Sequence, residues 1–118
     1  MSDDPSMTYL ANISELVDHA PESTVSRTVL KGEGARLVLF SFATGQELSE
    51  HTAAVPVLLQ TLDGSLEVSA SGETVTLAPG DVIHLPSRLP HSVVANEPSR
   101  MLLTMLDPRQ AAPLKPTH

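Results

Sequence analysis

The sequence predicts a single all-β domain, a barrel or a sandwich, with little helix. About eight or nine short segments either alternate apolar and polar residues or run apolar, and glycine or proline stands at nearly every join between them. A length of 118 residues fits one domain with a hydrophobic core of its own. No internal repeat and no low-complexity block interrupts this pattern.

The chain divides into three parts by composition. Residues 1–8 are polar and acidic and are predicted to form a disordered lead. The barrel domain is predicted over residues 9–107. Three prolines in residues 108–118 predict a tail without regular structure.

A short helical turn is predicted before the first strand. Apolar residues recur there at helical spacing, and Pro21 stops any longer helix. We expect this turn to pack on the outside of the barrel through Leu10, Ile13, Leu16 and Val17.

From residue 24 onward the apolar period changes from that of a helix to that of a strand. Turn signals separate the segments, with Asp63-Gly64 predicting a hairpin and Ser71-Gly72 a second tight turn. The predicted strands cover residues 24–30, 35–43, 47–52, 55–62, 66–70, 75–77, 82–85, 92–95 and 101–106.

The segment over residues 35–43 is the strongest strand signal and is apolar on both faces. Leu37 and Leu39 lie on one face, and Val38, Phe40 and Phe42 lie on the other. A strand of this kind is normally covered on both sides. The barrel core covers one face, and a second subunit is the simplest way to cover the other. The sequence therefore predicts a homodimer.

Composition excludes several classes of function. The formal net charge is −7, and the seven Lys and Arg residues are scattered, which argues against a nucleic-acid partner. No segment approaches the ~20 apolar residues of a membrane-spanning helix, and the acidic N-terminus is unlike a secretory signal. Together with the absence of cysteine, this predicts a soluble, cytoplasmic protein without a membrane partner.

Two histidine-containing segments carry the motif evidence. In the first, five residues separate a glycine from His51, and a second glycine closes the segment. In the second, five residues separate a glycine from a proline, and His91 follows. The framework consists of Gly45, His51, Gly64, Gly80, Pro86 and His91.

This framework resembles the two motifs of the cupin family, over roughly residues 35–106. The chain is similar to small single-domain RmlC-like cupins of the cupin 2 conserved barrel type. The resemblance implies a short antiparallel jelly-roll β-barrel. The family's second histidine, glutamate, glycine and asparagine are replaced here by Ala53, Val57, Arg88 and Ala95.

In the family, three histidines and the glutamate hold one divalent metal inside the barrel mouth. The resemblance therefore carries two metal ligands over to this chain, His51 and His91. The implied cofactor is one divalent ion, Zn, Fe, Ni or Mn, held weakly because a catalytic site normally has three protein ligands.

Strand alternation gives the neighbours of this site. Val57, Leu59 and Thr61 share the face of the family's glutamate and are predicted, with Met101, to line a ligand pocket. Two further residues, Gln60 and His84, are candidate accessory groups, although alternation turns both away from the barrel interior.

Three functions follow from this reading. The first is a cupin of unassigned activity that binds a small molecule in the barrel, with a divalent metal at His51 and His91. The second is a metal-dependent oxygenase or isomerase acting on a small organic substrate. The third is a non-enzymatic ligand-sensing module that acts through a partner, because the chain has no helix-turn-helix pattern.

Overall fold

The computed structural model describes residues 4–107 as nine β-strands and one short 3₁₀ turn. The elements are η1 (Ile13–Leu16), β1 (Thr24–Gly32), β2 (Ala35–Phe42), β3 (Glu47–His51), β4 (Val57–Asp63), β5 (Leu66–Ala70), β6 (Glu73–Leu77), β7 (Val82–Leu85), β8 (His91–Ala95) and β9 (Ser99–Leu106).

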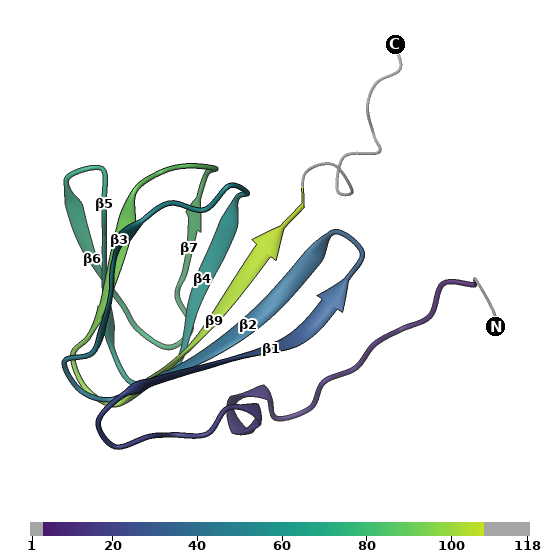
Figure 1. Cartoon of the computed structure of the whole chain (residues 1–118), viewed down its shortest axis with the longest axis horizontal. Helices are drawn as coiled ribbons and strands as arrows, with labels where there is room; N and C mark the ends of the chain where they lie inside the picture. The colour runs from purple at the N-terminus through teal and green to yellow at the C-terminus, as the bar shows by residue number, and fades with distance from the viewer. Residues whose placement is uncertain (1–3, 108–118) are drawn as a thin grey trace, which may run out of the picture.

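The strands form two antiparallel sheets that face each other (Figure 1). The five-stranded sheet has the order β1-β2-β9-β4-β7, and the four-stranded sheet has the order β3-β8-β5-β6. Strands that are distant in sequence, such as β2 and β9, are therefore neighbours in space. This confirms the prediction of an all-β, antiparallel jelly-roll with almost no helix.

The main core lies between the two sheets. Alternate residues of each strand point into it, as the period of two requires. The five-stranded sheet contributes Phe42, Val57, Leu59, Leu85 and Met101, each at most 4% exposed. The four-stranded sheet contributes Leu66, Val68, Leu77, Val93 and Ala95, each at most 3% exposed.

A second apolar cluster lies on the outer face of the five-stranded sheet. There Val17, which follows η1, packs with Leu39 of β2 and Leu102 of β9, and all three are buried. Ile13 and Leu16 pack against the same cluster. The predicted helical turn is thus present on the outside of the barrel, and it supplies part of the cover that the two-faced strand β2 needs.

The prediction of a hairpin at Asp63-Gly64 is wrong. β4 pairs with β7 and β9 in one sheet, whereas β5 pairs with β6 and β8 in the other. The turn is therefore a corner that carries the chain from one sheet to the other. By contrast, Ser71-Gly72 is the expected tight turn, with φ of 55° and 77°.

The ends of the chain lie partly outside the described residues. Residues 4–8 are exposed and contain no helix or strand. Residues 1–3 and the predicted tail over residues 108–118 are outside the described range, so that part of the domain division stays a prediction. Among residues 4–107, no helix has the length and apolar character needed to cross a membrane.

Candidate metal and ligand site at the barrel mouth

The two histidines of the sequence motifs meet at one end of the barrel. His51 ends β3 and His91 begins β8, and the two residues are directly paired across these neighbouring strands. Their imidazole rings lie 4.4 Å apart between centroids, at an interplanar angle of 57°. Segments separated by 40 positions in the chain therefore place two nitrogen heterocycles in contact.

A β-bulge in β3 makes this pairing possible. Leu48 pairs with Val93 and His51 with His91, so three steps along β3 match two steps along β8. Without the extra residue, alternation would send the side chains of Leu48 and His51 to opposite faces. The bulge puts both on the inner face, whereas Glu50 lines a groove on the outer face of the four-stranded sheet.

Both imidazoles are oriented by backbone carbonyls. Nδ1 of His51 lies 2.7 Å from the carbonyl oxygen of Ser49, and Nδ1 of His91 lies 2.8 Å from that of Leu89. A carbonyl oxygen only accepts hydrogen bonds, so each Nδ1 carries the proton and donates it. With Nδ1 as the donor, Nε2 is the ring nitrogen left to bind a ligand, which is the arrangement of histidines that bind metals.

The two histidines differ in exposure. The His91 residue is only 4% exposed, whereas His51 is exposed at the rim. A ligand or ion would therefore reach the pair from the His51 side.

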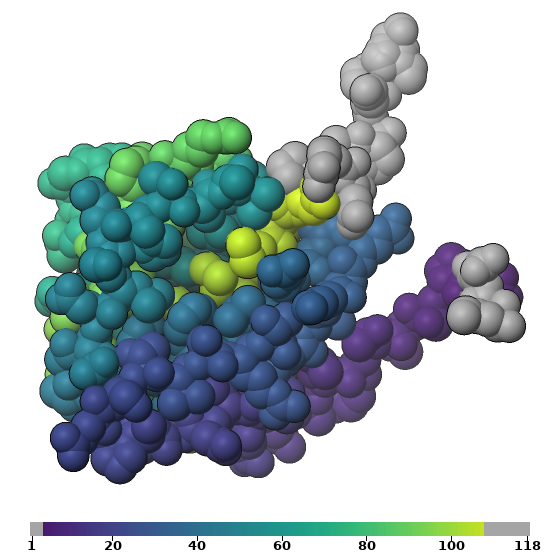
Figure 2. Space-filling view, viewed as in Figure 1, coloured from purple at the N-terminus to yellow at the C-terminus, as the bar shows by residue number. Residues whose placement is uncertain are grey.

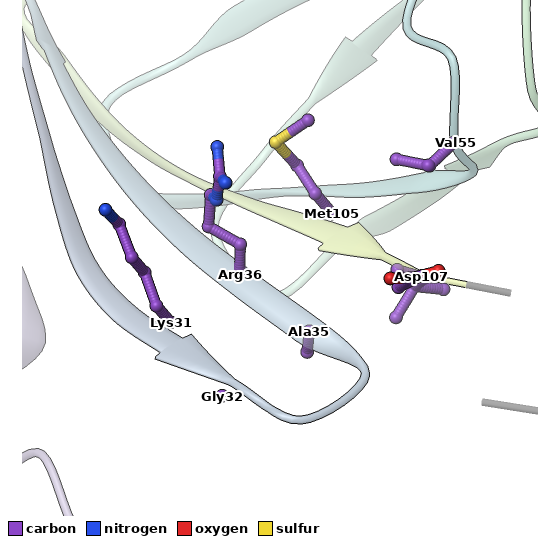
Figure 3. A pocket seen from close by; sticks show the side chains of 8 residues that line it. Lys31, Gly32, Ala35, Arg36, Val55, Met105 and Asp107 are labelled. Carbon is purple, nitrogen blue, oxygen red and sulfur yellow. The ribbon is translucent and has the colours of Figure 1, made fainter. Parts of the chain in front are cut away.

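The chain also has a hollow at the same end of the barrel, although neither histidine lines it. It has a volume of about 310 Å³ and lies between the β1–β2 hairpin, the end of β9 and the connection from β3 to β4. Figure 2 shows this depression, with yellow β9 residues at its floor between the blue hairpin and the teal residues above. The side chains around it include Lys31, Arg36, Val55, Met105, Leu106 and Asp107 (Figure 3).

The profile of the Cupin domain family matches residues 38–106, which is more than half of the chain. The chain belongs to the cupin family. Among curated proteins, none has a sequence that matches this cupin.

Solved structures agree with the assignment. A conserved protein of unknown function from Streptococcus pyogenes is 26% identical, with a TM-score of 0.77, over 92% of this cupin and 96% of that chain. An RmlC-like cupin from Desulfovibrio desulfuricans is also 26% identical, with a TM-score of 0.75, over 85% and 97%. Salicylate 1,2-dioxygenase from Pseudoaminobacter salicylatoxidans, solved with gentisate, shares the fold at 21% identity and a TM-score of 0.68, over 76% of this cupin and 26% of that chain.

The residues of this cupin fit a metal only in part. The two Nε2 atoms suit one divalent ion. Among residues 4–107, however, no group of three or more His, Cys, Asp or Glu side chains is placed to hold a metal. Ala53 and Val57 stand at the positions of the missing ligands, and neither supplies a donor because both side chains are hydrocarbon. Other donors must come from water or from a bound molecule.

Arg88 occupies the position of the second motif's glycine and has a backbone conformation that glycine favours. Its φ is 65°, in the left-handed region that side chains rarely adopt. Its N–H donates to the carbonyl oxygen of Ala53 over 2.7 Å. This bond ties the loop before His91 to the connection after His51, and thereby joins the two motifs at the mouth.

The four predicted pocket residues lie deeper than the hollow. Val57, Leu59 and Met101 are packed in the core, each at most 1% exposed. Thr61 is 3% exposed, and its hydroxyl donates a 2.8 Å hydrogen bond to the carbonyl oxygen of Leu77. Contact between a ligand and these four side chains stays a prediction.

The two accessory candidates face away from the mouth. Gln60 pairs with Leu102 and Val82, and His84 pairs with Leu58, all on the outer face of the five-stranded sheet. The irregularity in the pairing of β4 with β9 lies after Thr61, so it does not turn Gln60 inward. His84 is exposed there. The structure thus brings together His51 and His91 alone of the predicted site residues at the mouth.

Sequence reasoning missed the cations beside the hollow. Lys31 and Arg36 flank the Gly32-Glu33-Gly34 turn at positions that pair across a hairpin. Recognising that pairing would have placed two positive charges on one face. The two cations lie at the mouth because β9 and the β3–β4 connection end beside them. A local sequence pattern does not predict where those two segments end.

Proposed function

We propose that this cupin binds a small molecule at the barrel mouth and holds one divalent metal there, weakly, through Nε2 of His51 and His91. The supporting observation is the orientation of the two rings, which are 4.4 Å apart and each bonded through Nδ1 to a backbone carbonyl. Both Nε2 lone pairs are thereby directed away from the backbone.

The metal would act as a Lewis acid that polarises an oxygen of a bound molecule. The protein's own part is to fix the two imidazole tautomers and to leave the other coordination positions open. With two protein ligands in place of four, the affinity for the ion is expected to be low, and the ion exchanges readily. An oxygenase or isomerase activity would depend on donors that the bound molecule brings.

The test is a metal titration of untagged, chelator-treated protein. Zn²⁺ and Ni²⁺ are added to the wild type, to the His51→Ala/His91→Ala variant and to His84→Ala, and binding is followed by calorimetry and elemental analysis. His84 is a matched control because it is exposed on the outer sheet face. We expect about one ion per chain in the wild type and in His84→Ala, and none in the double variant. Equal metal content in all three proteins would contradict the proposal.

We also propose that two chains associate through the outer face of the five-stranded sheet. The N-terminal segment covers β2 and β9, whereas Leu58 of β4 is half-buried and Val82 of β7 is 57% exposed. Exposed apolar area of this kind favours an interface. Light scattering on Val82→Glu should show a monomer, and Val75→Glu, on the other sheet, should leave the dimer. A monomeric wild type would refute the proposal.

We also propose that the protein is located in the cytoplasm. It is supported by the absence of cysteine from the sequence. Cell fractionation tests it directly, and recovery in an extracytoplasmic fraction would contradict it.

A further inference from the structure

Two cations stand side by side on the inner face of the β1–β2 hairpin. Lys31 and Arg36 are paired directly across the two strands. Like charges in this position destabilise a strand pair, typically by some tenths of a kcal/mol. Within residues 4–107, no hydrogen bond or ion pair is made by either side chain. The chain carries a net charge of −7, so two unpaired neighbouring cations are an unusual local excess.

An apolar wall lies next to these cations. Arg36 pairs with Met105 of β9, and Figure 3 shows Lys31, Arg36 and Met105 extending on the same side of the sheet. Val55 points toward Met105 from the β3–β4 connection. Both Val55 and Met105 are half-buried, so the hollow combines a charged side with an apolar side.

The hollow belongs to the same end of the barrel as the histidine pair. Val55 follows His51 by four residues, which limits their separation to about 14 Å. Met105 pairs with Val57 and packs against the core cluster that includes Val93, two residues after His91. The hollow and the two imidazoles therefore lie at the same end of the barrel, although neither imidazole lines the hollow.

We infer that this hollow binds a small organic carboxylate with an apolar body, its carboxylate on Lys31 and Arg36 and its body on Met105 and Val55. A guanidinium matches a carboxylate in a bidentate fork, and an ammonium adds a point charge. The volume of about 310 Å³ is at the lower end of small-molecule sites, which admits a single ring or a short chain. Asp107 also lines the hollow, which favours a ligand with one negative charge over a polyanion. The inference rests on the proposed binding of a small molecule at the mouth and names its chemical class.

The experiment uses benzoate as the probe, with benzamide as its uncharged counterpart and inorganic phosphate as an anion without an apolar body. Untagged, metal-free protein is titrated by calorimetry and by two-dimensional amide NMR. The variants are Lys31→Gln/Arg36→Gln and the control Arg27→Gln. Arg27 lies on the same hairpin but pairs with Leu39, so it belongs to the opposite face. Lys31 and Arg36 are both exposed, so the double substitution should leave the fold intact.

We expect benzoate to bind and to shift the amide signals of residues 31–36, 55 and 105–107. The double substitution should weaken binding about tenfold, and Arg27→Gln should leave it unchanged. Binding should also weaken as the salt concentration rises. Equal affinity in the double variant, or equal affinity for benzamide, would overturn the role of the cations. Equal affinity for phosphate would overturn the role of the apolar wall.

The metal-free design separates this inference from the proposed metal site. Zn²⁺ binding without benzoate binding would refute the carboxylate site and leave the metal site standing. Benzoate binding without Zn²⁺ binding would establish the carboxylate site and refute the metal site.

Discussion

Substitution of Gly64 tests how the chain turns from one sheet to the other. Gly64 has φ of +89°, and a Cβ built on it would lie 2.5 Å from the carbonyl oxygen of Pro98 and 2.7 Å from Cα of Ser99. It would also overlap Oγ of Ser99. Backbone atoms cannot move out of the way as the end of a flexible side chain can. We therefore expect Gly64→Ala to strain the corner and to displace Ser99.

The cost has two parts. A side chain in the left-handed region costs roughly 1–2 kcal/mol. Ser99 is 2% exposed, and its hydroxyl accepts from the N–H of Ser65 over 2.9 Å and donates to the carbonyl of Glu97 over 2.7 Å. Disturbing these partly buried bonds adds about 1–3 kcal/mol. The free energy of unfolding should fall by about 2–5 kcal/mol in total.

Gly72→Ala is the matched control. Gly72 has φ of +77°, but a Cβ built on it meets nothing within 4 Å. It should therefore show the conformational cost alone, about 1–2 kcal/mol. At about 4 °C per kcal/mol, thermal unfolding followed by circular dichroism at one protein concentration should separate the two variants by about 4–12 °C. Equal melting temperatures would refute the argument that the close approach to Pro98 and Ser99 fixes the corner.

Three further substitutions have predictable effects on thermal unfolding. Arg88→Gly removes a side chain from the left-handed backbone region, but it also raises the entropy of the unfolded chain. The net effect should be a stabilisation of about 0.5 kcal/mol. A lower melting temperature would show that the arginine side chain makes stabilising contacts. Val17→Asp places a carboxylate in the buried outer cluster and should lower the free energy of unfolding by about 3 kcal/mol. The control Met7→Asp, at a residue that is 90% exposed, should change it by less than about 0.5 kcal/mol. Similar losses in both variants would mean that the N-terminal segment does not pack on the sheet. Thr61→Val removes the buried hydroxyl that donates to the Leu77 carbonyl and should lower the free energy of unfolding by about 1–2 kcal/mol. The control Thr74→Val, at an exposed residue, should lower it less. The reverse order would contradict the burial of Thr61.

Much of the fold could be predicted because local patterns determine strands. The alternation in residues 66–70 and the apolar run over residues 35–43 gave strands close to the observed bounds of β5 and β2. The prediction failed at Asp63-Gly64, where a local turn signal does not reveal whether the next strand pairs back or crosses to another sheet. That choice depends on contacts with Pro98 and Ser99, more than 30 residues away.

The outer cover of β2 shows the same limit. Leu37 and Leu39 indicate correctly that a second layer is needed. The sequence does not say how much of that layer the segment around Val17 supplies and how much is left for a partner chain. The structure assigns the area over β2 and β9 to the N-terminal segment, so the proposed interface moves toward β4 and β7.

For the site, the motifs located both histidines but not the details that give them their chemistry. The inward direction of His51 depends on a bulge, which alternation cannot anticipate, and the tautomers depend on the carbonyls of Ser49 and Leu89.

The replacement of two family ligands by Ala53 and Val57 has a consequence for metal binding. A metal held by two imidazoles must complete its coordination with donors from solvent or ligand, so its affinity should rise when a molecule with an oxygen donor occupies the mouth. The cation pair at Lys31 and Arg36 would hold such a molecule in place, which would couple the binding of the ion to the binding of the carboxylate.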